Sequence, residues 1–425
     1  MAFKLLTGPY LNNLTRMANA ATTNPSMHTL FPVTHAYDNR SAKAAMFSAA
    51  QDDSVVTFNQ TMVQGGGFES DADVAEWTVL GVGSQAKDAT SPHAGTYSLL
   101  ITPGGSAVEV ITYQDVLVRA GEELTFQAAA KAGTGDAVIR IRNRQTGNWL
   151  DTNGAWQASV TALFTEAGGS WQTCAETFTV ESLATCKEDT VYLRIFLRGD
   201  QGTARFDQVA LFPSVSWASV HGHNIPPFIV PTLQRSTDGT SWTTETTMTL
   251  RRDSFHASLG SLKAYQYWRL LFDGRPDTGS LMHVGEIVLG QSFDMGHNPA
   301  YGAGITWTEK QTRLETDLGE PFVHLHNVKA PQRSMVMTIN TRGDTEYESL
   351  YKTIFRGSRG GGNLICIAPT EMDSGVAILG RVQEALAMVK STPDWRTGEL
   401  EVTELPLPSV PDVVHAYDAP VEDPV

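Results

Sequence analysis

The sequence predicts a mainly β protein made of several packed sheets. Many segments alternate apolar and polar residues, and this period of two is typical of half-buried strands. Turn-forming Gly, Asp and Pro residues separate these segments, and no alternation of strands with helices indicates a parallel sheet. The clearest strand segments are residues 116–118, 124–128, 138–142, 191–198, 204–211, 334–339, 364–367 and 398–403.

Only two segments predict helices. Residues 345–356 place apolar side chains at positions i, i+3, i+4, i+7 and i+8, and Thr345 with Glu348 forms a capping box before Gly357 ends the helix. Residues 378–389 predict a second, less regular helix. Residues 411–425 are rich in proline and acid, which predicts an extended tail.

Composition excludes several classes of function. The chain has 425 residues, a formal net charge of −15 and 18% charged residues. Its length suggests about three domains. The acidic balance argues against a nucleic-acid partner, and no apolar run is long enough for membrane insertion. Three cysteines without metal-ligand spacing predict neither a disulfide framework nor a metal cluster. We therefore expect synthesis in a cytoplasm.

Two separated regions carry the motifs of one domain. The motifs of the second region are a GHN turn at 222–224, an SxDGxxW hairpin at 236–242, a YWRL strand at 267–270 and a closing GEIVLG at 285–290. Together with residues 35–40 and 55–59 they resemble the discoidin-type jelly roll found on phage tail proteins. The resemblance implies a discontinuous domain formed by residues 1–64 and 214–290.

The segment between these regions, residues 65–213, resembles a different family. It contains GGGFE at 65–69, Trp77, AGTYSLLI at 94–101, Trp171 before a strand, and ARFDQVAL at 204–211. In this order the elements are similar to carbohydrate-binding modules of xylanases and glucanases. The resemblance implies an inserted β-sandwich with a structural calcium ion held by Glu69, Asp207 and the backbone at Gly95. We expect no other cofactor.

The remaining residues, 291–410, contain strands, one helix and an acidic closing strand. This pattern resembles the tube-type domain of phage distal tail proteins. The three regions together resemble a siphophage-like distal tail or tail-tip structural protein. That family implies location in the virion tail, other phage tail proteins as partners, and a homo-oligomeric ring of threefold or sixfold symmetry.

Strand alternation in the inserted sandwich also predicts a sugar-binding face. Ile139 and Ile141, with the Val, Leu and Ile residues of 191–198, should pack inward. The side chains left on the other face are Arg140, Arg142, Tyr192, Arg194, Phe196 and Arg198. Aromatic rings pack on sugar C–H groups, and Arg side chains donate hydrogen bonds to sugar hydroxyl groups. The alternative is that the Arg side chains only solvate an exposed face. The candidate carbohydrate-binding residues are Trp77, Arg140, Arg142, Trp149, Trp156, Tyr192 and Arg194, whereas Trp171 is expected in the core.

No motif indicates catalysis, so we expect a binding protein and not an enzyme. A GxSxG elbow is absent from the sequence, and Glu76, Asp115, Glu176 and Glu181 show no pairing typical of a glycosidase. The pairs His221/His223 and His324/His326 are expected on solvated faces. Two functions remain as alternatives to a tail component that contacts host glycans. They are a carbohydrate-binding adhesion protein outside a virion and a surface-glycan hydrolase.

Overall fold

The computed structural model describes residues 54–291 with short gaps and a set of flanking strands. The gaps are residues 106–109, 189, 224, 226–227, 251–253 and 274–281. The flanking described segments are 4–6, 22–23, 45–47, 293–294, 304–308, 311–315, 321–325, 332–342, 363–367, 377–382, 389–392 and 395–405. Most of these residues lie in antiparallel strands, so the predicted mainly β fold class is confirmed.

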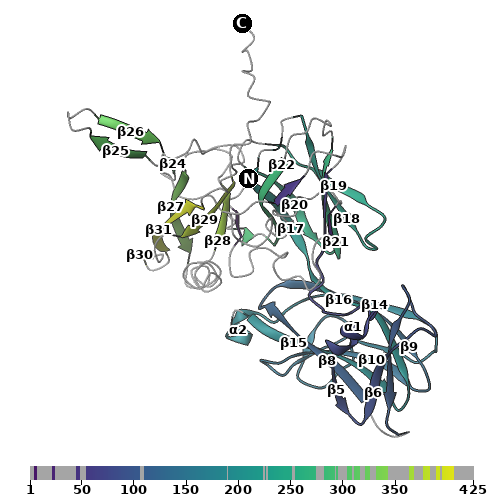
Figure 1. The fold of residues 1–425 in the computed structure, drawn as a ribbon. Helices are drawn as coiled ribbons and strands as arrows, with labels where there is room; N and C mark the ends of the chain where they lie inside the picture. Colours follow the sequence, from purple (N-terminus) through teal and green to yellow (C-terminus); the bar gives the residue numbers. More distant parts are fainter. Residues whose placement is uncertain are drawn as a thin grey trace.

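The inserted region forms a sandwich of two sheets (Figure 1). The seven-stranded sheet has the order β12-β11-β10-β15-β8-β5, with β13 also paired to β10. Its strands are β5 (Thr78–Gly81), β8 (Val110–Arg119), β10 (Asp136–Asn143), β11 (Trp149–Leu150), β12 (Trp156–Gln157), β13 (Phe164–Glu166) and β15 (Thr190–Asp200). The five-stranded sheet has the order β14-β9-β16-β7-β6, formed by β6 (Gly83–Asp88), β7 (Ser98–Pro103), β9 (Glu123–Ala132), β14 (Gln172–Thr179) and β16 (Ala204–Pro213).

The facing sides of these two sheets bury one hydrophobic core. Ile139, Ile141, Ile195 and Leu197 of the larger sheet are fully buried, as the alternation of their strands requires. Phe126 of the smaller sheet is also among the fully buried residues of this core. Two short helices, α1 (Asp71–Ala75) and α2 (Leu183–Cys186), lie in the connections. Because every second residue points inward, the intervening polar residues are displayed on the outside of the sandwich.

Strands on both sides of the insertion pair with each other in a second sandwich. Strand β4 (Ser54–Asn59) is antiparallel to β21 (Tyr267–Asp273), with Phe58 opposite Trp268. One sheet has the order β19-β18-β21-β4-β2 and the other β20-β17-β22-β3. The further strands are β2 (Thr22–Thr23), β3 (Ala45–Phe47), β17 (Val215–His223), β18 (Val230–Ser236), β19 (Thr243–Thr247), β20 (Ser254–Lys263) and β22 (Met282–Gly290). We call this unit the jelly roll.

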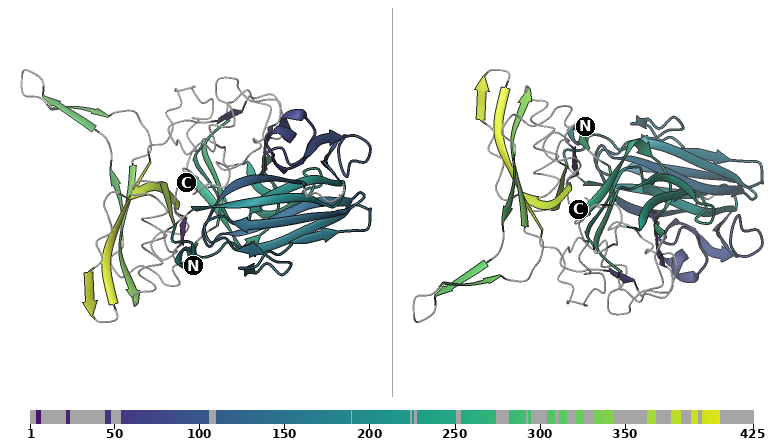
Figure 2. Two further views of the ribbon diagram at one scale, coloured as in Figure 1. Left: turned by 90° about the horizontal axis from the view of Figure 1, so that it is seen from below. Right: turned by 90° about the horizontal axis from the view of Figure 1, so that it is seen from above.

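The jelly roll adjoins both other units (Figures 1 and 2). The inserted sandwich is connected to it through β16, which runs into β17. Gln291 at the end of the jelly roll donates to the carbonyl oxygen of Glu123 in the sandwich over 2.7 Å. On the other side, β20 contacts β29 (Ala377–Val382) of the C-terminal sheet.

The C-terminal sheet has the order β23-β1-β28-β29-β31-β27-β24, and β30 also pairs with β31. Its strands are β1 (Lys4–Leu6), β23 (Phe293–Asp294), β24 (Gly304–Thr308), β27 (Gln332–Arg342), β28 (Asn363–Ile367), β30 (Val389–Thr392) and β31 (Trp395–Glu404), beside a hairpin of β25 (Gln311–Glu315) and β26 (Pro321–Leu325). Strand β1 pairs with β28, so residues 4–6 lie in this sheet and not in the jelly roll, where the sequence analysis placed residues 1–64.

The helix expected at residues 378–389 is not formed over its first half. Residues 377–382 are strand β29, which pairs with β28 on one side and β31 on the other. Pairing on both sides satisfies the backbone polar groups of this segment, so tertiary context overrides its irregular helical period. The helix predicted at 345–356 and the tail predicted at 411–425 lie outside the described residues.

The histidine pair of β17 is buried, which corrects the expected solvated face. His221 is 3% exposed and His223 is 9% exposed. Burial, together with the positive charge of Arg333, lowers the pKa of His221 to about 3, so its imidazole is neutral. Of the second pair, His324 lies on β26 and His326 falls outside the described residues. Within the described part of the chain, no helix is long and apolar enough to cross a membrane.

Candidate functional site

The outward-pointing side of the seven-stranded sheet, which we call the outer face, carries a row of three aromatic side chains. Trp149 of β11 stacks on Phe196 of β15, with ring centroids 5.4 Å apart and an interplanar angle of 29°. Phe196 is the direct cross-strand partner of Tyr113 on β8, and their ring centroids are 6.2 Å apart. All three rings are half-buried. The row therefore offers apolar ring surface of the kind that packs on sugar C–H groups.

A row of charged side chains runs beside the aromatic one. Arg142, Arg194 and Asp115 are direct partners across β10, β15 and β8. Arg194 donates two hydrogen bonds to Asp115, of 2.7 and 2.8 Å, and Arg144 donates a third of 2.9 Å. The Arg194 guanidinium lies 4.0 Å from the centroid of the Tyr113 ring. These contacts hold two planar guanidinium groups at defined positions.

The other predicted residues of the outer face lie close to these rows. Arg140 on β10 is the cross-strand partner of Phe196. The Arg142 guanidinium is 5.3 Å from the Trp149 ring, and its Nε donates to the carbonyl oxygen of Gly147 over 3.2 Å. Tyr192 is 49% exposed, so its ring is available to a ligand. The outer face therefore brings together Arg140, Arg142, Trp149, Tyr192 and Arg194 of the predicted set.

The Asp115 carboxylate is committed to ion pairing. Burial raises its pKa, but the hydrogen bonds and charge of Arg194 and the charge of Arg144 outweigh that effect and hold the pKa of Asp115 below its usual range. A general acid of a glycosidase needs the opposite shift. The electrostatics of Asp115 thus suit fixed recognition better than proton transfer.

Glu181 holds the hairpin that presents Trp149. This hairpin connects β10 to β11. The Glu181 carboxylate is 9% exposed and accepts hydrogen bonds from Asn143 (2.7 Å), Thr146 (2.5 Å) and Asn148 (2.7 Å). Because all three donors belong to one short segment, a single carboxylate fixes the conformation of the hairpin. Trp149 follows directly after Asn148.

Two predicted tryptophans do not belong to the outer face. Trp77 is 2% exposed and packs in the core against Phe68, with ring centroids 5.8 Å apart. Trp156 is half-buried on the edge strand β12, packs on Phe178 of the opposite sheet, and donates its indole N–H to the carbonyl oxygen of Thr179 over 2.8 Å. Trp77 is therefore closed to a ligand, whereas Trp156 is the cross-strand partner of buried Leu150 and lies on the inner side of the sheet.

Trp171 is also placed differently from the expectation. It is half-buried at the start of β14 and not part of the core. Its indole N–H donates to the carbonyl oxygen of Ser91 over 3.2 Å, and its ring contacts His93 edge-on. Cys174 of β14 and Cys186 of α2 are free buried thiols.

Sequence reasoning placed Phe196 on the outer face but did not select it, Tyr113, Asp115 or Arg144 as binding residues. In the structure, buried and half-buried residues alternate without exception along β8. The sequence shows no matching alternation of apolar and polar residues, because two of the buried residues, Thr112 and Gln114, are polar. The observed period puts Tyr113 and Asp115 on one side of the strand. Which strand lies next to β15 depends on sheet order, however, and sheet order is a property of the folded chain.

The three residues implied for calcium meet at one loop, residues 93–96. The Asp207 carboxylate is 1% exposed and accepts the amides of His93 and Ala94 over 2.9 and 3.0 Å. Both Glu69 carboxylate oxygens accept the Thr96 amide, over 3.0 and 3.1 Å. Gly95 adopts a φ of +64°, and a Cβ there would lie 1.9 Å from a Glu69 oxygen. The loop thus approaches Glu69 as closely as only glycine permits.

The donor set fits a hard cation in its chemistry. Burial raises the pKa of Asp207, and backbone hydrogen bonds offset this only in part. Among the described residues, neither Glu69 nor Asp207 forms an ion pair with Lys or Arg. Carboxylate oxygens are ligands that Ca²⁺ prefers, and in this structure those of Glu69 and Asp207 accept backbone amides of the loop. No cluster of three His, Cys, Asp or Glu side chains suited to a metal occurs in the described part of the chain.

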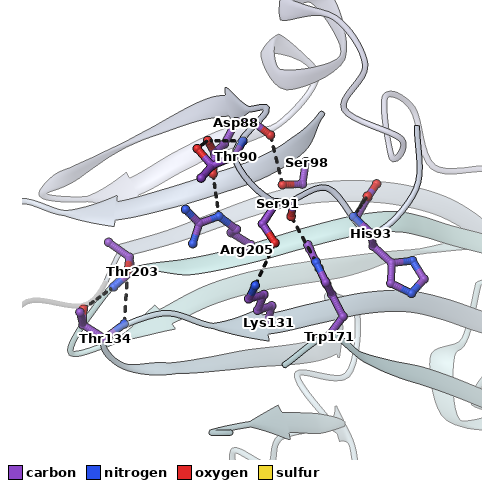
Figure 3. Close-up of polar contacts among 11 residues, drawn as sticks. Asp88, Thr90, Ser91, His93, Ser98, Lys131, Thr134, Trp171, Thr203 and Arg205 are labelled. Carbon is purple, nitrogen blue, oxygen red and sulfur yellow. Dashed lines mark hydrogen bonds and ion pairs between the residues drawn. The ribbon is translucent and has the colours of Figure 1, made fainter. Parts of the chain in front are cut away.

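Contacts of Asp88 and Ser91 fix the segment before this loop to the five-stranded sheet (Figure 3). Lys131 donates to the hydroxyl of Ser91 over 2.8 Å, and Arg205 pairs with Asp88 over 2.6 Å. The loop also lines a pocket of about 520 Å³ between the sandwich and the jelly roll, whose other walls include Asp238 and Tyr267. A group bound at Glu69 and Asp207 would therefore sit near the junction of two domains.

Comparison with known proteins agrees with this description of the sandwich. Residues 60–202 match the family model described as a carbohydrate binding domain. The matched residues include the inserted sandwich from α1 to β15 and end before its last strand, β16. No curated protein matched the chain.

Several solved structures are similar to part of the chain. One is the enzymatically active domain of bacteriophage CBA120 tailspike protein 4, with 16% identity, a TM-score of 0.28, and coverage of 36% of this chain and 21% of that chain. Another is the CBM22-2 xylan-binding domain of Paenibacillus barcinonensis Xyn10C, with 16% identity, a TM-score of 0.26, and coverage of 35% and 97%. A third is the C-terminal family 22 carbohydrate binding module of Clostridium thermocellum Xyn10B, with 14% identity, a TM-score of 0.24, and coverage of 34% and 90%. This chain spans about one fifth of the length of the tailspike domain.

Proposed function

We propose that the protein binds glycans on the outer face of the inserted sandwich. The observation that carries this proposal is the aromatic row formed by Trp149, Phe196 and Tyr113 beside the guanidinium groups of Arg142 and Arg194. Sugar rings present C–H groups that pack on aromatic faces and hydroxyl groups that hydrogen-bond to planar donors. A face with both features side by side meets the two requirements of saccharide recognition.

We expect Trp149→Ala to weaken glycan binding about 30-fold, since one aromatic anchor typically contributes about 2 kcal/mol. Affinity electrophoresis through gels containing xylan, polygalacturonate or teichoic acid identifies a retarding polymer, and isothermal titration with that polymer measures the loss. Trp242→Ala is the matched control, because Trp242 is a half-buried tryptophan of the jelly roll that stacks on Arg269. Undiminished affinity of the Trp149 variant would show that ligands bind elsewhere.

We further propose that this face binds without cleaving. The Asp115 carboxylate accepts hydrogen bonds from two arginines, and the Glu181 carboxylate accepts hydrogen bonds from three donors of the β10–β11 hairpin. Neither is therefore free to act as a proton donor or nucleophile of a glycosidase. Release of reducing sugar from a bound bacterial polysaccharide would instead favour the hydrolase alternative.

Calcium is proposed as a structural ion held by Glu69, Asp207 and the backbone near Gly95. The ion would neutralise the charge of two carboxylates. Burial raises the pKa of Asp207, and a bound cation would counter this by stabilising its ionised form.

We expect millimolar calcium to raise the melting temperature of the chelator-treated protein, because a ligand that binds only the folded state stabilises it by mass action, by about 2.7 kcal/mol at a hundredfold excess over Kd. Glu69→Gln should abolish this rise, whereas Glu188→Gln, which removes one exposed acid of the same sandwich, should retain it. A melting temperature that does not respond to calcium in the unmodified protein would contradict the site.

We propose that the whole chain serves as a tail-tip or distal tail component of a phage virion, with other tail proteins as partners. The specific support is the jelly roll, whose SxDGxxW hairpin is locked by Asp238: its carboxylate accepts the Thr240 and Ser241 amides over 2.8 and 2.7 Å. The YWRL and GEIVLG motifs lie on β21 and β22 of the same unit. Several copies around a tail would multiply a weak glycan affinity.

Electron microscopy of the purified chain tests the tail assignment. Rings with threefold or sixfold symmetry, and antibody labelling of the tail of virions, are the expected results. Monomers at high concentration that still bind glycans would favour a carbohydrate-binding adhesion protein outside a virion.

A further inference from the structure

The outer face carries a charge opposite to that of the whole protein. The chain has a formal net charge of −15. The central part of the outer face nevertheless displays four arginines, Arg140, Arg142, Arg144 and Arg194, and one acid, Asp115. The net negative charge of the protein repels anions. A face with a local excess of positive charge can attract them instead.

Asp115 neutralises only part of this charge. Its carboxylate is shared by Arg194 and Arg144, at 2.7 and 2.9 Å. Arg142 makes no ion pair with an acid among the described residues, where its contacts are the Gly147 carbonyl oxygen and the Trp149 ring. Most of the five N–H donors of Arg142 therefore remain available to a ligand.

The position of Arg142 opposite Arg194 is a second, independent observation. The two residues are direct cross-strand partners on β10 and β15. Like charges at such positions repel and destabilise a sheet. An anionic group bound between the two guanidinium groups would remove this repulsion and accept hydrogen bonds from both.

We infer that the outer face recognises a negatively charged glycan, with Arg142 and Arg194 receiving its carboxylate or phosphate groups. The inference rests on the proposed function and specifies its ligand class. A sugar ring packed on Trp149 places its substituents beside Arg142, whose guanidinium is 5.3 Å from that ring. Planar guanidinium groups bind carboxylate and phosphate oxygens in pairs, which a neutral hydroxyl cannot match.

The test compares two polymers with the same sugar backbone. Polygalacturonate carries a carboxylate on each residue, and its fully methyl-esterified form carries none. We expect the protein to bind the charged form at least tenfold more tightly. This preference should fade as salt shortens the Debye length from about 10 Å at about 0.1 M to about 3 Å at about 1 M. A polyglycerol-phosphate teichoic acid, assayed in parallel, distinguishes phosphate from carboxylate as the preferred source of charge.

Arg142→Gln isolates the residue that carries the inference. We expect this variant to lose about tenfold in affinity for the charged polymer, the effect of one charge-assisted contact, without a fall in melting temperature. Lys390→Gln is the matched control, because Lys390 is exposed on β30 of the C-terminal sheet and its substitution removes the same charge elsewhere.

The outcomes separate this inference from the proposed function. Preference for polygalacturonate or teichoic acid, lost in Arg142→Gln, supports the inference. Equal or tighter binding of the esterified polymer overturns it and leaves glycan binding intact. Failure to bind any of the three polymers, or any member of a neutral and acidic glycan array, overturns both.

Discussion

Replacing Glu404 with glutamine is expected to destabilise the C-terminal sheet by about 3 to 5 kcal/mol, the usual consequence of leaving one charge of a buried pair uncompensated. Glu404 on β31 and Arg333 on β27 are each 5% exposed. The Glu404 carboxylate accepts from the Arg333 backbone amide over 3.1 Å and from its Nε over 2.9 and 3.0 Å, and it also contacts Nη2. Without this carboxylate the buried Arg333 guanidinium would lose these hydrogen bonds and the negative charge of Glu404. Urea unfolding of the full chain, followed by a probe in the C-terminal sheet, measures the loss.

A double variant distinguishes charge burial from a general loss of packing. Arg333→Met with Glu404→Leu removes both charges and keeps side-chain volume, so it should regain most of the stability lost in Glu404→Gln. The neighbouring polar pair Ser334 and Thr403, whose hydroxyls are 3.1 Å apart, is left intact in every variant. Equal destabilisation of the single and double variants would show that the ion pair is not what stabilises these strands.

Replacing Glu181 with alanine is expected to reduce both the stability of the inserted sandwich and its affinity for glycans. The carboxylate accepts three hydrogen bonds from the β10–β11 hairpin, including one from Asn143, which is fully buried. Since hydrogen bonds to charged groups contribute about 1.5 to 3 kcal/mol and are not additive, we expect a stability loss of about 3 kcal/mol. The freed hairpin no longer holds Trp149 against Phe196, so affinity should fall toward that of Trp149→Ala.

Two measurements separate this positioning role from a merely structural one. Quenching of tryptophan fluorescence by iodide, measured at a temperature where the variant stays folded, should increase as Trp149 becomes more accessible. Glu181→Gln retains one acceptor oxygen and should lie between the unmodified protein and the alanine variant in affinity. Glu188→Ala, which removes an exposed acid from the following loop, should change neither property. Unchanged affinity in Glu181→Ala would contradict the role assigned to this residue.

Local sequence patterns were sufficient for the direction of side chains along β10 and β15, but not for His221 and His223 of β17, which are buried. Along β10, alternation placed Ile139 and Ile141 inside and Arg140 and Arg142 outside, and the observed burial follows this order. The fold class followed from the same period of two, because strand alternation is set by backbone geometry within the strand. Turn residues likewise marked the hairpin at 236–242, since Asp238 hydrogen-bonds to amides only two and three residues away.

Features that depend on residues distant in the sequence could not be predicted from these local patterns. Trp77 and Trp149 are both tryptophans near strand ends, yet one is packed against Phe68 in the core and the other is stacked on Phe196 at the surface. Residues 377–382 are a strand because β28 and β31 offer hydrogen-bond partners on both sides. The side of a strand that a residue occupies is determined by its own backbone, so the sequence alone determined the mainly β class and the arginine-bearing face. Only the tertiary structure decided which strands adjoin, and thus that Asp115 pairs with Arg194, that Arg142 faces Arg194, and that Glu181 supports Trp149.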